Sequence, residues 1–187
     1  FHAKAQRPWS SILWANLFFL MVSVAAGLWW AIQYVARAGW SAMILRVPQA
    51  ITSYLPYGGF IMLLIIILGG LHWHHIYHWM EPGITDPSDS HYDEIIANKS
   101  IYLNFPFFFI RSVIYIGGWI WMISLMKKYS YNEDRLGGIK WYQKSFKVAV
   151  GFVLFLGLTS TTAAWDWVMS IDPHWFSTLF GWYSLAS

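Results

Sequence analysis

The sequence predicts an all-α membrane protein, a polytopic bundle of transmembrane helices. Of its 187 residues, 57% are hydrophobic and only 11% are charged. Its apolar runs are longer than a soluble core requires, because a membrane span needs about 20 apolar residues. The basic residues lie in short connections between these runs, where they orient a membrane protein. The net charge of +3 therefore does not indicate a nucleic-acid partner.

The expected spans follow the apolar runs along the chain. The second contains the run from Phe60 to Leu68, and the third has Pro106 in its first turn, where a missing N–H costs little. Asp172 is a suitable N-cap and Pro173 a suitable first residue for a further helix, whose run is too short to cross the bilayer. We therefore expect part of a longer protein. Residues 1–187 should form one four-helix-bundle unit with spans at about 11–35, 57–79, 104–126 and 148–169 and the start of a fifth helix at 173.

Two of the expected loops differ in charge. The loop 80–103 contains a stretch from Glu81 to Glu94 with five carboxylates and no Lys or Arg, whereas the loop 127–147 carries six basic residues. Cytoplasmic loops are enriched in Lys and Arg, so we expect 127–147 in the cytoplasm and 80–103 on the outer side. Because successive spans alternate in direction, the end of the second, the start of the third and the end of the fourth should share the outer side.

Several polar residues fall at this outward end. Arg111 lies inside the third span and Asp166 inside the fourth, where a charge needs a partner or a function. Thr159 and Thr162 share a helical face with Asp166, so hydroxyls and a carboxylate could relay protons. The alternatives are a structural Arg111–Asp166 pair and threonines that bond to their own helix. The same candidate proton-path or quinone-contact cluster includes His72, His75, Asp172 and His174.

The second expected span ends in a histidine-rich run, Leu71 to Trp79, with four histidines. A haem inside a bundle takes histidines from facing helices, and the other expected spans contain none. His74 and His78 lack carboxylates on the same turn for a metal site and fit an interfacial aromatic belt with Trp73. The absence of cysteine excludes thiolate-bound iron–sulfur clusters and Cys-ligated zinc. We expect no metal or haem in this chain, with a haem-binding cytochrome b-type subunit as an alternative.

Three longer motifs carry a family resemblance. The runs Gln33–Ser41, Tyr102–Ser112 and Ala164–Thr178 closely resemble the second NrfD-like (polysulfide-reductase-type) integral membrane subunit of alternative complex III. That bacterial assembly is a quinol:cytochrome c oxidoreductase. The resemblance implies about ten helices in the full protein, as two four-helix bundles with a flanking helix at each end. This chain would supply the first bundle.

The resemblance also implies a function and partners in the bacterial inner membrane. The subunit would contribute scaffold and a proton route, with quinone or quinol contact as a further role, while it binds no redox cofactor itself. Haem c and iron–sulfur clusters would belong to multihaem and monohaem cytochrome c subunits and an iron–sulfur subunit. Further implied partners are a paralogous NrfD-like subunit, small membrane subunits, lipid and a terminal oxidase. A purely structural scaffold is the alternative.

Overall fold

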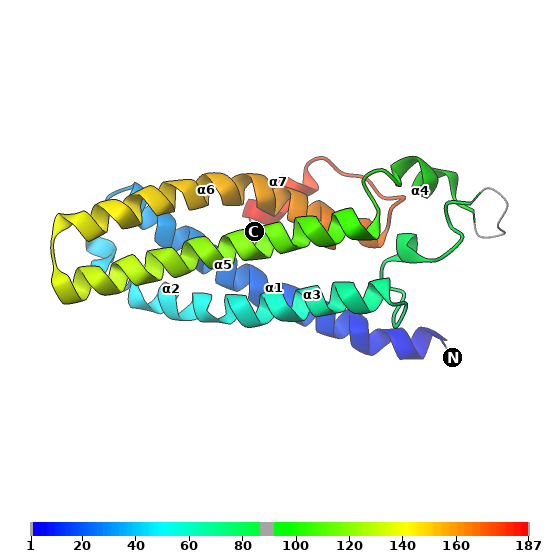
Figure 1. Ribbon diagram of the computed structural model, residues 1–187, viewed down its shortest axis with the longest axis horizontal. Helices are drawn as coiled ribbons and strands as arrows, with labels where there is room; N and C mark the ends of the chain where they lie inside the picture. Colours follow the sequence, from blue (N-terminus) through cyan, green and yellow to red (C-terminus); the bar gives the residue numbers. More distant parts are fainter. Residues whose placement is uncertain (1, 87–91, 187) are drawn as a thin grey trace. The chain divides into compact units, whose positions relative to one another are not determined.

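Every regular element in the part of the chain that the structure describes is a helix, which confirms the all-α fold class (Figure 1). The computed structural model describes residues 2–86 and 92–186, so positions 87–91 of the expected acidic loop lie outside the described residues. Four helical stretches in this part are long and apolar enough to cross a membrane: Arg7–Val35, Arg46–Gly70, Phe105–Leu136 and Ile139–Ile171. The chain is therefore a multi-pass helical membrane protein.

The chain packs into two compact units, and the long helices contribute to both. Unit 1 combines Phe1–Asn16, Phe60–Tyr115 and Thr159–Ser187, and unit 2 combines Leu17–Gly59 and Ile116–Leu158. The helices that run through both are α1 (His2–Val35), α3 (Leu55–Gly70), α5 (Phe105–Leu136) and α6 (Ile139–Trp167).

Unit 1 holds the ends of three long helices close together. Gly70 at the end of α3 faces Phe105 at the start of α5, because a Cβ on Gly70 would lie only 2.2 Å from that ring. Phe108 on α5 and Trp167 on α6 are fully buried in its core. The unit also contains two short helices, α4 (Glu94–Lys99) and α7 (Phe180–Ala186). Asp93 caps α4 by accepting a hydrogen bond of 2.9 Å from the N–H of Ile95.

Unit 2 contains α2 (Arg46–Ile51) and a core of large apolar side chains. Trp30, Trp119 and Phe152 come from α1, α5 and α6 and are fully buried. Gly27 lets α1 approach α5, since a Cβ there would lie 2.8 Å from the Ile123 side chain. Small residues at such crossings are typical of membrane helix bundles.

The second expected span is wrong at its end: α3 stops at Gly70, not near Trp79. The N–H of Trp73 bonds to the carbonyl of Leu68, and the N–H of His72 bonds to that of Gly69. With His72 at φ 60°, this is a Schellman motif, which terminates a helix. The histidine-rich run therefore folds as an irregular segment. The span is extended at its other end instead, because α2 leads into α3 through a short 3₁₀ turn at Thr52–Tyr54.

The expectation of a loop at 127–147 is also wrong, because this segment is almost entirely helical. Helix α5 continues to Leu136 and α6 begins at Ile139. The turn between them uses Gly137 and Gly138, at φ 64° and 90°, a region that glycine enters without steric cost. The charged residues of this hairpin thus lie on helices that extend beyond the apolar part of their spans.

The fifth helix does not begin at Pro173. Asp172 accepts a hydrogen bond of 3.2 Å from the N–H of His174, but this local turn leads into irregular chain, and α7 starts only at Phe180. Asp172 therefore shapes a turn. A cap-like pattern alone does not start a helix, and here the chain outside regular helices continues from Asp172 to the start of α7.

Candidate functional site

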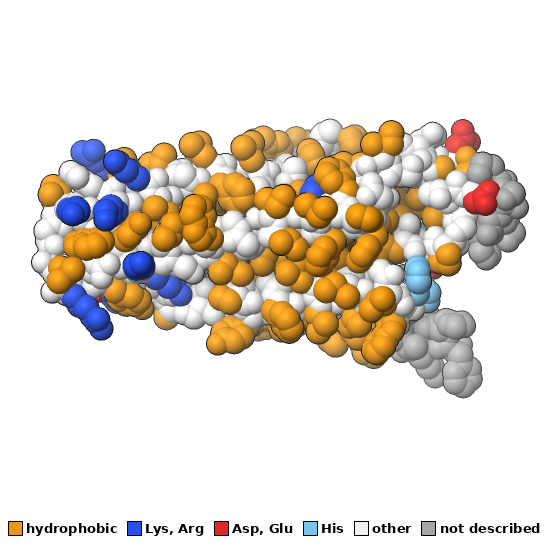
Figure 2. Space-filling view, viewed as in Figure 1, with side chains coloured by type: hydrophobic (Ala, Val, Ile, Leu, Met, Phe, Trp, Pro, Cys, Tyr) orange, Lys and Arg blue, Asp and Glu red, His pale blue; other side chains and the backbone are white. Residues whose placement is uncertain are grey.

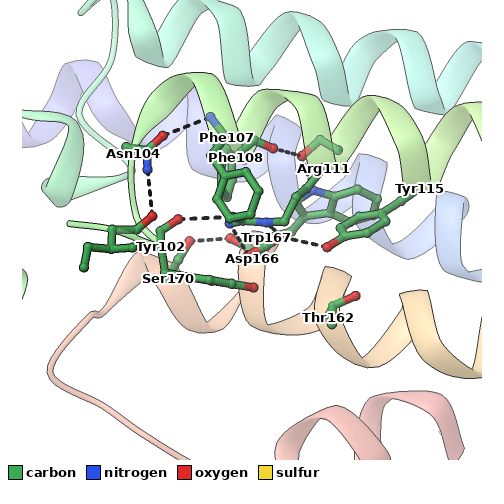
Figure 3. A network of polar contacts seen from close by, with 12 residues as sticks. Tyr102, Asn104, Phe107, Phe108, Arg111, Tyr115, Thr162, Asp166, Trp167 and Ser170 are labelled. Atoms are coloured by element: carbon green, nitrogen blue, oxygen red, sulfur yellow. Dashed lines mark hydrogen bonds and ion pairs between the residues drawn. The ribbon is translucent and has the colours of Figure 1, made fainter. Parts of the chain in front are cut away.

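The start of α5 fixes the position of Arg111. Asn104 caps the helix by accepting a hydrogen bond of 3.0 Å from the N–H of Phe107, and its amide donates to the carbonyl of Ile101 at 2.9 Å. Pro106 occupies the first turn, where its missing N–H is not needed. Arg111 follows after about two turns and points toward α6 (Figure 3).

Arg111 and Asp166 form a bidentate ion pair inside unit 1. Arg111 Nε donates to Asp166 Oδ2 and Nη2 donates to Oδ1, both at 2.8 Å. Asp166 is fully buried, and the Arg111 side chain is 10% exposed. A planar guanidinium matches a carboxylate in this two-point geometry, which adds orientation as well as strength. The structure thus brings together the two charges that the sequence placed inside separate spans.

Aromatic rings enclose the guanidinium. Its Cζ lies 3.9 Å from the ring centroid of Tyr102 and 4.2 Å from that of Phe107. Arg111 Nη1 also donates to the carbonyl oxygen of Tyr102 at 3.1 Å. Burial, together with the charge of Asp166, raises the pKa of the Tyr102 phenol. The cation is therefore held between ring faces, an arrangement that is favourable where water is excluded.

Two hydroxyl groups donate hydrogen bonds to Asp166, one to its carboxylate and one to its backbone. Tyr115 donates to Asp166 Oδ2 at 3.3 Å, and Ser170 donates to the backbone carbonyl of Asp166. Thr162 lies beside Tyr115 (Figure 3), and its own hydroxyl donates to the carbonyl of Thr159 at 3.1 Å. The threonines on the Asp166 face are therefore partly engaged with their own helix, and Tyr115 is the hydroxyl that reaches the acid.

A second set of hydrogen bonds fixes the end of α6. Trp167 Nε1 donates to the hydroxyl of Ser112 at 3.0 Å, and Ser112 donates to the carbonyl of Phe108 at 3.0 Å. Tyr77 donates to the carbonyl of Trp167 at 3.2 Å. Burial first, and then the charge of Asp166, raises the pKa of Tyr77. These bonds hold the backbone beside Asp166 and so orient its side chain.

An apolar cavity of about 280 Å³ adjoins the ion pair in unit 1. Tyr102 and Ser170 line it, and both contact the pair. Trp165 also lines it, and its buried indole N–H has no partner among the described residues. Lys99 stands at the cavity and donates to the carbonyl of Pro173 at 2.6 Å. The cavity thus combines an apolar interior with a few polar groups, as small-molecule sites do.

The histidines and Asp172 expected in this cluster have other positions. His75 Nδ1 lies 3.6 Å from Glu81 Oε1, and His174 Nε2 lies 2.8 Å from Asp93 Oδ2. His72 terminates α3 and is exposed. Asp172 makes the local turn described above. Among the described residues, none of these four forms a hydrogen bond or ion pair with Arg111 or Asp166.

Sequence reasoning missed four residues that contact the pair. Phe107 and Tyr115 lie four residues before and after Arg111 on α5, and Ser170 follows Asp166 by four, so helical spacing could have found all three. Tyr102 could not be found this way, because it precedes α5 and reaches Arg111 through a turn.

The remaining histidine-rich segment forms no metal cluster in the described chain. No group of three or more His, Asp or Glu side chains there is placed to hold a metal ion. His74 is buried, with Nε2 2.9 Å from the carbonyl oxygen of Ile65 and its ring 5.3 Å from that of Trp9. His78 Nδ1 lies 3.1 Å from Glu81 Oε2.

No protein-family model matches the chain, and no curated protein matches it either.

Proposed function

We propose that this chain is an integral membrane subunit of a bacterial quinol:cytochrome c oxidoreductase, or of one with another periplasmic acceptor. In this proposal it contributes scaffold and a proton route through Asp166. The observation that carries it is the buried Arg111–Asp166 pair, which is bonded to the Tyr115 hydroxyl and shares Tyr102 and Ser170 with an apolar cavity. Intramembrane charges of this kind commonly mark proton or substrate pathways.

The distribution of charge supports an orientation for this proposal. The α5–α6 hairpin carries Lys and Arg in excess, so it would lie in the cytoplasm of a bacterial inner membrane. Because successive spans alternate in direction, Arg111 and Asp166 would then lie toward the periplasm, where the iron–sulfur and cytochrome c subunits would receive electrons. Quinone contact is a further role for the cavity, whose volume falls near the lower end for ligand pockets.

The sharpest test removes one hydroxyl and keeps the ion pair. In the assembled complex, we expect Tyr115→Phe to lower quinol turnover at least about tenfold, because the hydroxyl that donates to Asp166 in the proposed proton route is lost. Thr52→Val is the control, since it deletes a buried hydroxyl in unit 2 whose hydrogen bond goes to the carbonyl of Gln49. Asp166→Asn should lower turnover and proton release further. Normal turnover and proton release in both Tyr115→Phe and Asp166→Asn would contradict the proton route.

A purely structural role is the second candidate, and the geometry of the pair favours it in one respect. Both carboxylate oxygens and three guanidinium nitrogens are already hydrogen-bonded within the protein. For a scaffold, Arg111→Leu alone should destabilise the complex by about 3–5 kcal/mol, because a buried carboxylate loses its partner. Arg111→Leu with Asp166→Asn should be tolerated better and retain turnover. Thermal stability and turnover of the two variants together separate the candidates.

A further inference from the structure

A second cavity lies wholly within unit 2, where α1 ends and α5 turns into α6. Its volume is about 280 Å³, and it is lined by Gln33, Tyr34, Arg37, Leu45, Glu133 and Tyr142, among others. Three membrane-length helices, Arg7–Val35, Phe105–Leu136 and Ile139–Ile171, begin or end here. The cavity therefore lies at the boundary between hydrocarbon and water, the depth at which lipid headgroups are found.

The backbone at the end of α1 places Arg37 at an unusual position. The N–H of Ala38 bonds to the carbonyl of Gln33 at 2.9 Å, and the N–H of Arg37 bonds to that of Tyr34 at 3.1 Å. This is a Schellman motif whose left-handed residue is normally glycine, but here it is Arg37 at φ 52°. A strained non-glycine residue beside a cavity suggests that its side chain is needed there.

The cavity carries one charge of each sign. Tyr34 donates to Glu133 Oε2 at 3.3 Å, and Arg37 lies 5.5 Å from the ring centroid of Phe146. Within the described residues, neither Glu133 nor Arg37 belongs to an ion pair. The adjacent carboxylate, Asp134, instead pairs with Arg46. Figure 2 shows Lys and Arg gathered over this end of α5 and α6, so an unpaired acid facing the cavity is unexpected.

Gln33 supplies an uncharged polar group to the same cavity. Gln33 is about nine-tenths buried, at 9% exposure, and it lines the cavity. Its amide provides an oxygen that accepts and an N–H₂ that donates hydrogen bonds.

We propose that this cavity binds the headgroup of a phosphatidylethanolamine lipid. The phosphate would lie on Arg37, and the ammonium group would donate to Glu133 and to the amide oxygen of Gln33. A headgroup with only negative charge would meet the Glu133 carboxylate, and a choline group has no N–H to donate to it. Tyr142, whose ring centroid is 5.4 Å from that of Tyr34, offers an aromatic face to the cation.

Native mass spectrometry of the full-length protein in detergent tests this proposal. The protein is supplied with phosphatidylethanolamine, phosphatidylcholine and phosphatidylglycerol of matched acyl chains. We expect wild-type protein to retain phosphatidylethanolamine about tenfold over the other two, the difference expected for one charge-assisted hydrogen bond. Glu133→Gln should abolish this preference. Asp134→Asn should keep it, because that carboxylate pairs with Arg46 and does not line the cavity.

Arg37→Gly extends the test to the phosphate. Glycine suits φ 52°, so this variant removes the guanidinium without strain and should lower retention of all three lipids. Equal retention of phosphatidylethanolamine and phosphatidylcholine by wild-type protein would overturn the proposal without any variant. A preference for phosphatidylglycerol, or equal effects of Glu133→Gln and Asp134→Asn, would also overturn it. Retention of none of the three lipids would overturn it as well.

Discussion

At the residue scale, the Arg111–Asp166 pair shows what a charge inside a span requires. Transfer of both charges from water costs several kcal/mol each, and their attraction offsets this only when the remaining polar atoms are satisfied. Here the Tyr102 carbonyl, the Tyr115 hydroxyl and two ring faces complete the shell. Each of these contacts comes from a residue within about three turns of the pair along α5 or just before it. A substitution in this shell therefore acts on both charges at once.

His74, which lies outside the spans, is likewise a buried polar group whose ring nitrogens both face hydrogen-bonding partners. Its Nε2 faces the carbonyl oxygen of Ile65 and its Nδ1 faces the N–H of Ile76, which fits a neutral imidazole with Nε2 as the donor. Burial lowers the pKa of His74 from its ordinary value of 6.5. As the pH falls through 6.5, the unfolded chain takes up this proton before the folded protein does. His74 thus contributes stability above that pH, and the contribution is lost as the pH falls below it.

Thermal unfolding in detergent at pH 7.5 and pH 5.5 tests whether His74 lowers the stability of the protein as the pH falls. Wild-type protein should lose more stability at the lower pH than His74→Gln does. His72→Gln is the control, because His72 is exposed and should leave the wild-type loss unchanged. If His74→Gln lost as much stability as wild-type protein, His74 would not be the group responsible.

At the element scale, the packing of α5 on α6 depends on adjacent glycines with different surroundings. A Cβ on Gly118 would lie 2.4 Å from the ring of Phe155, whereas a Cβ on Gly117 meets nothing within 4 Å. Alanine at 118 must displace that ring, and overpacking of this kind costs about 1–3 kcal/mol. Alanine at 117 should be neutral or stabilise by up to about 1 kcal/mol, because glycine is a poor helix former.

The paired variants Gly118→Ala and Gly117→Ala therefore form a matched test of the helix contact. Their midpoints of thermal unfolding in detergent should move in opposite directions, or the first should fall while the second stays unchanged. Equal midpoints would mean that Phe155 moves aside at no cost and that the close approach contributes little to stability.

Helix existence could be predicted from the sequence, but several helix ends could not. The apolar runs were sufficient to find the spans, because length and hydropathy alone decide which helices fit a bilayer. The end of α3 depends on a Schellman motif with His72 in a conformation that glycine usually adopts, and no pattern in the sequence marks it. The α5–α6 hairpin was missed because polar helices beyond the hydrocarbon resemble loops in composition.

At the scale of the whole molecule, topology explains how the site could be predicted in part. Alternation of spans brought Arg111 and Asp166 to one side of the membrane, and the structure pairs them. The same argument grouped His72, His75, Asp172 and His174 with them, because topology gives depth but not lateral position. Instead, His75 contacts Glu81 and His174 contacts Asp93. Side-chain partners depend on loop conformations that span periodicity does not encode.

The two cavities place distinct chemistry in the two units. Unit 1 holds an apolar cavity against a satisfied ion pair, and unit 2 holds a cavity lined by charges of both signs, Arg37 and Glu133. The first would serve the proton and quinone chemistry that we propose for the complex. The second would anchor a lipid. A loss of lipid retention without a loss of turnover would show that the two functions are independent.

The most direct test of the central proposal is a cryo-EM map of the assembled complex in lipid with quinone added, at a resolution that shows ordered water. The proton-route account predicts waters that connect Asp166 and Tyr115 with Thr162 and Thr159. Quinone density against Tyr102 and Ser170 would add the contact role. An Arg111–Asp166 pair with neither water nor quinone beside it would contradict the account and leave the chain a structural scaffold.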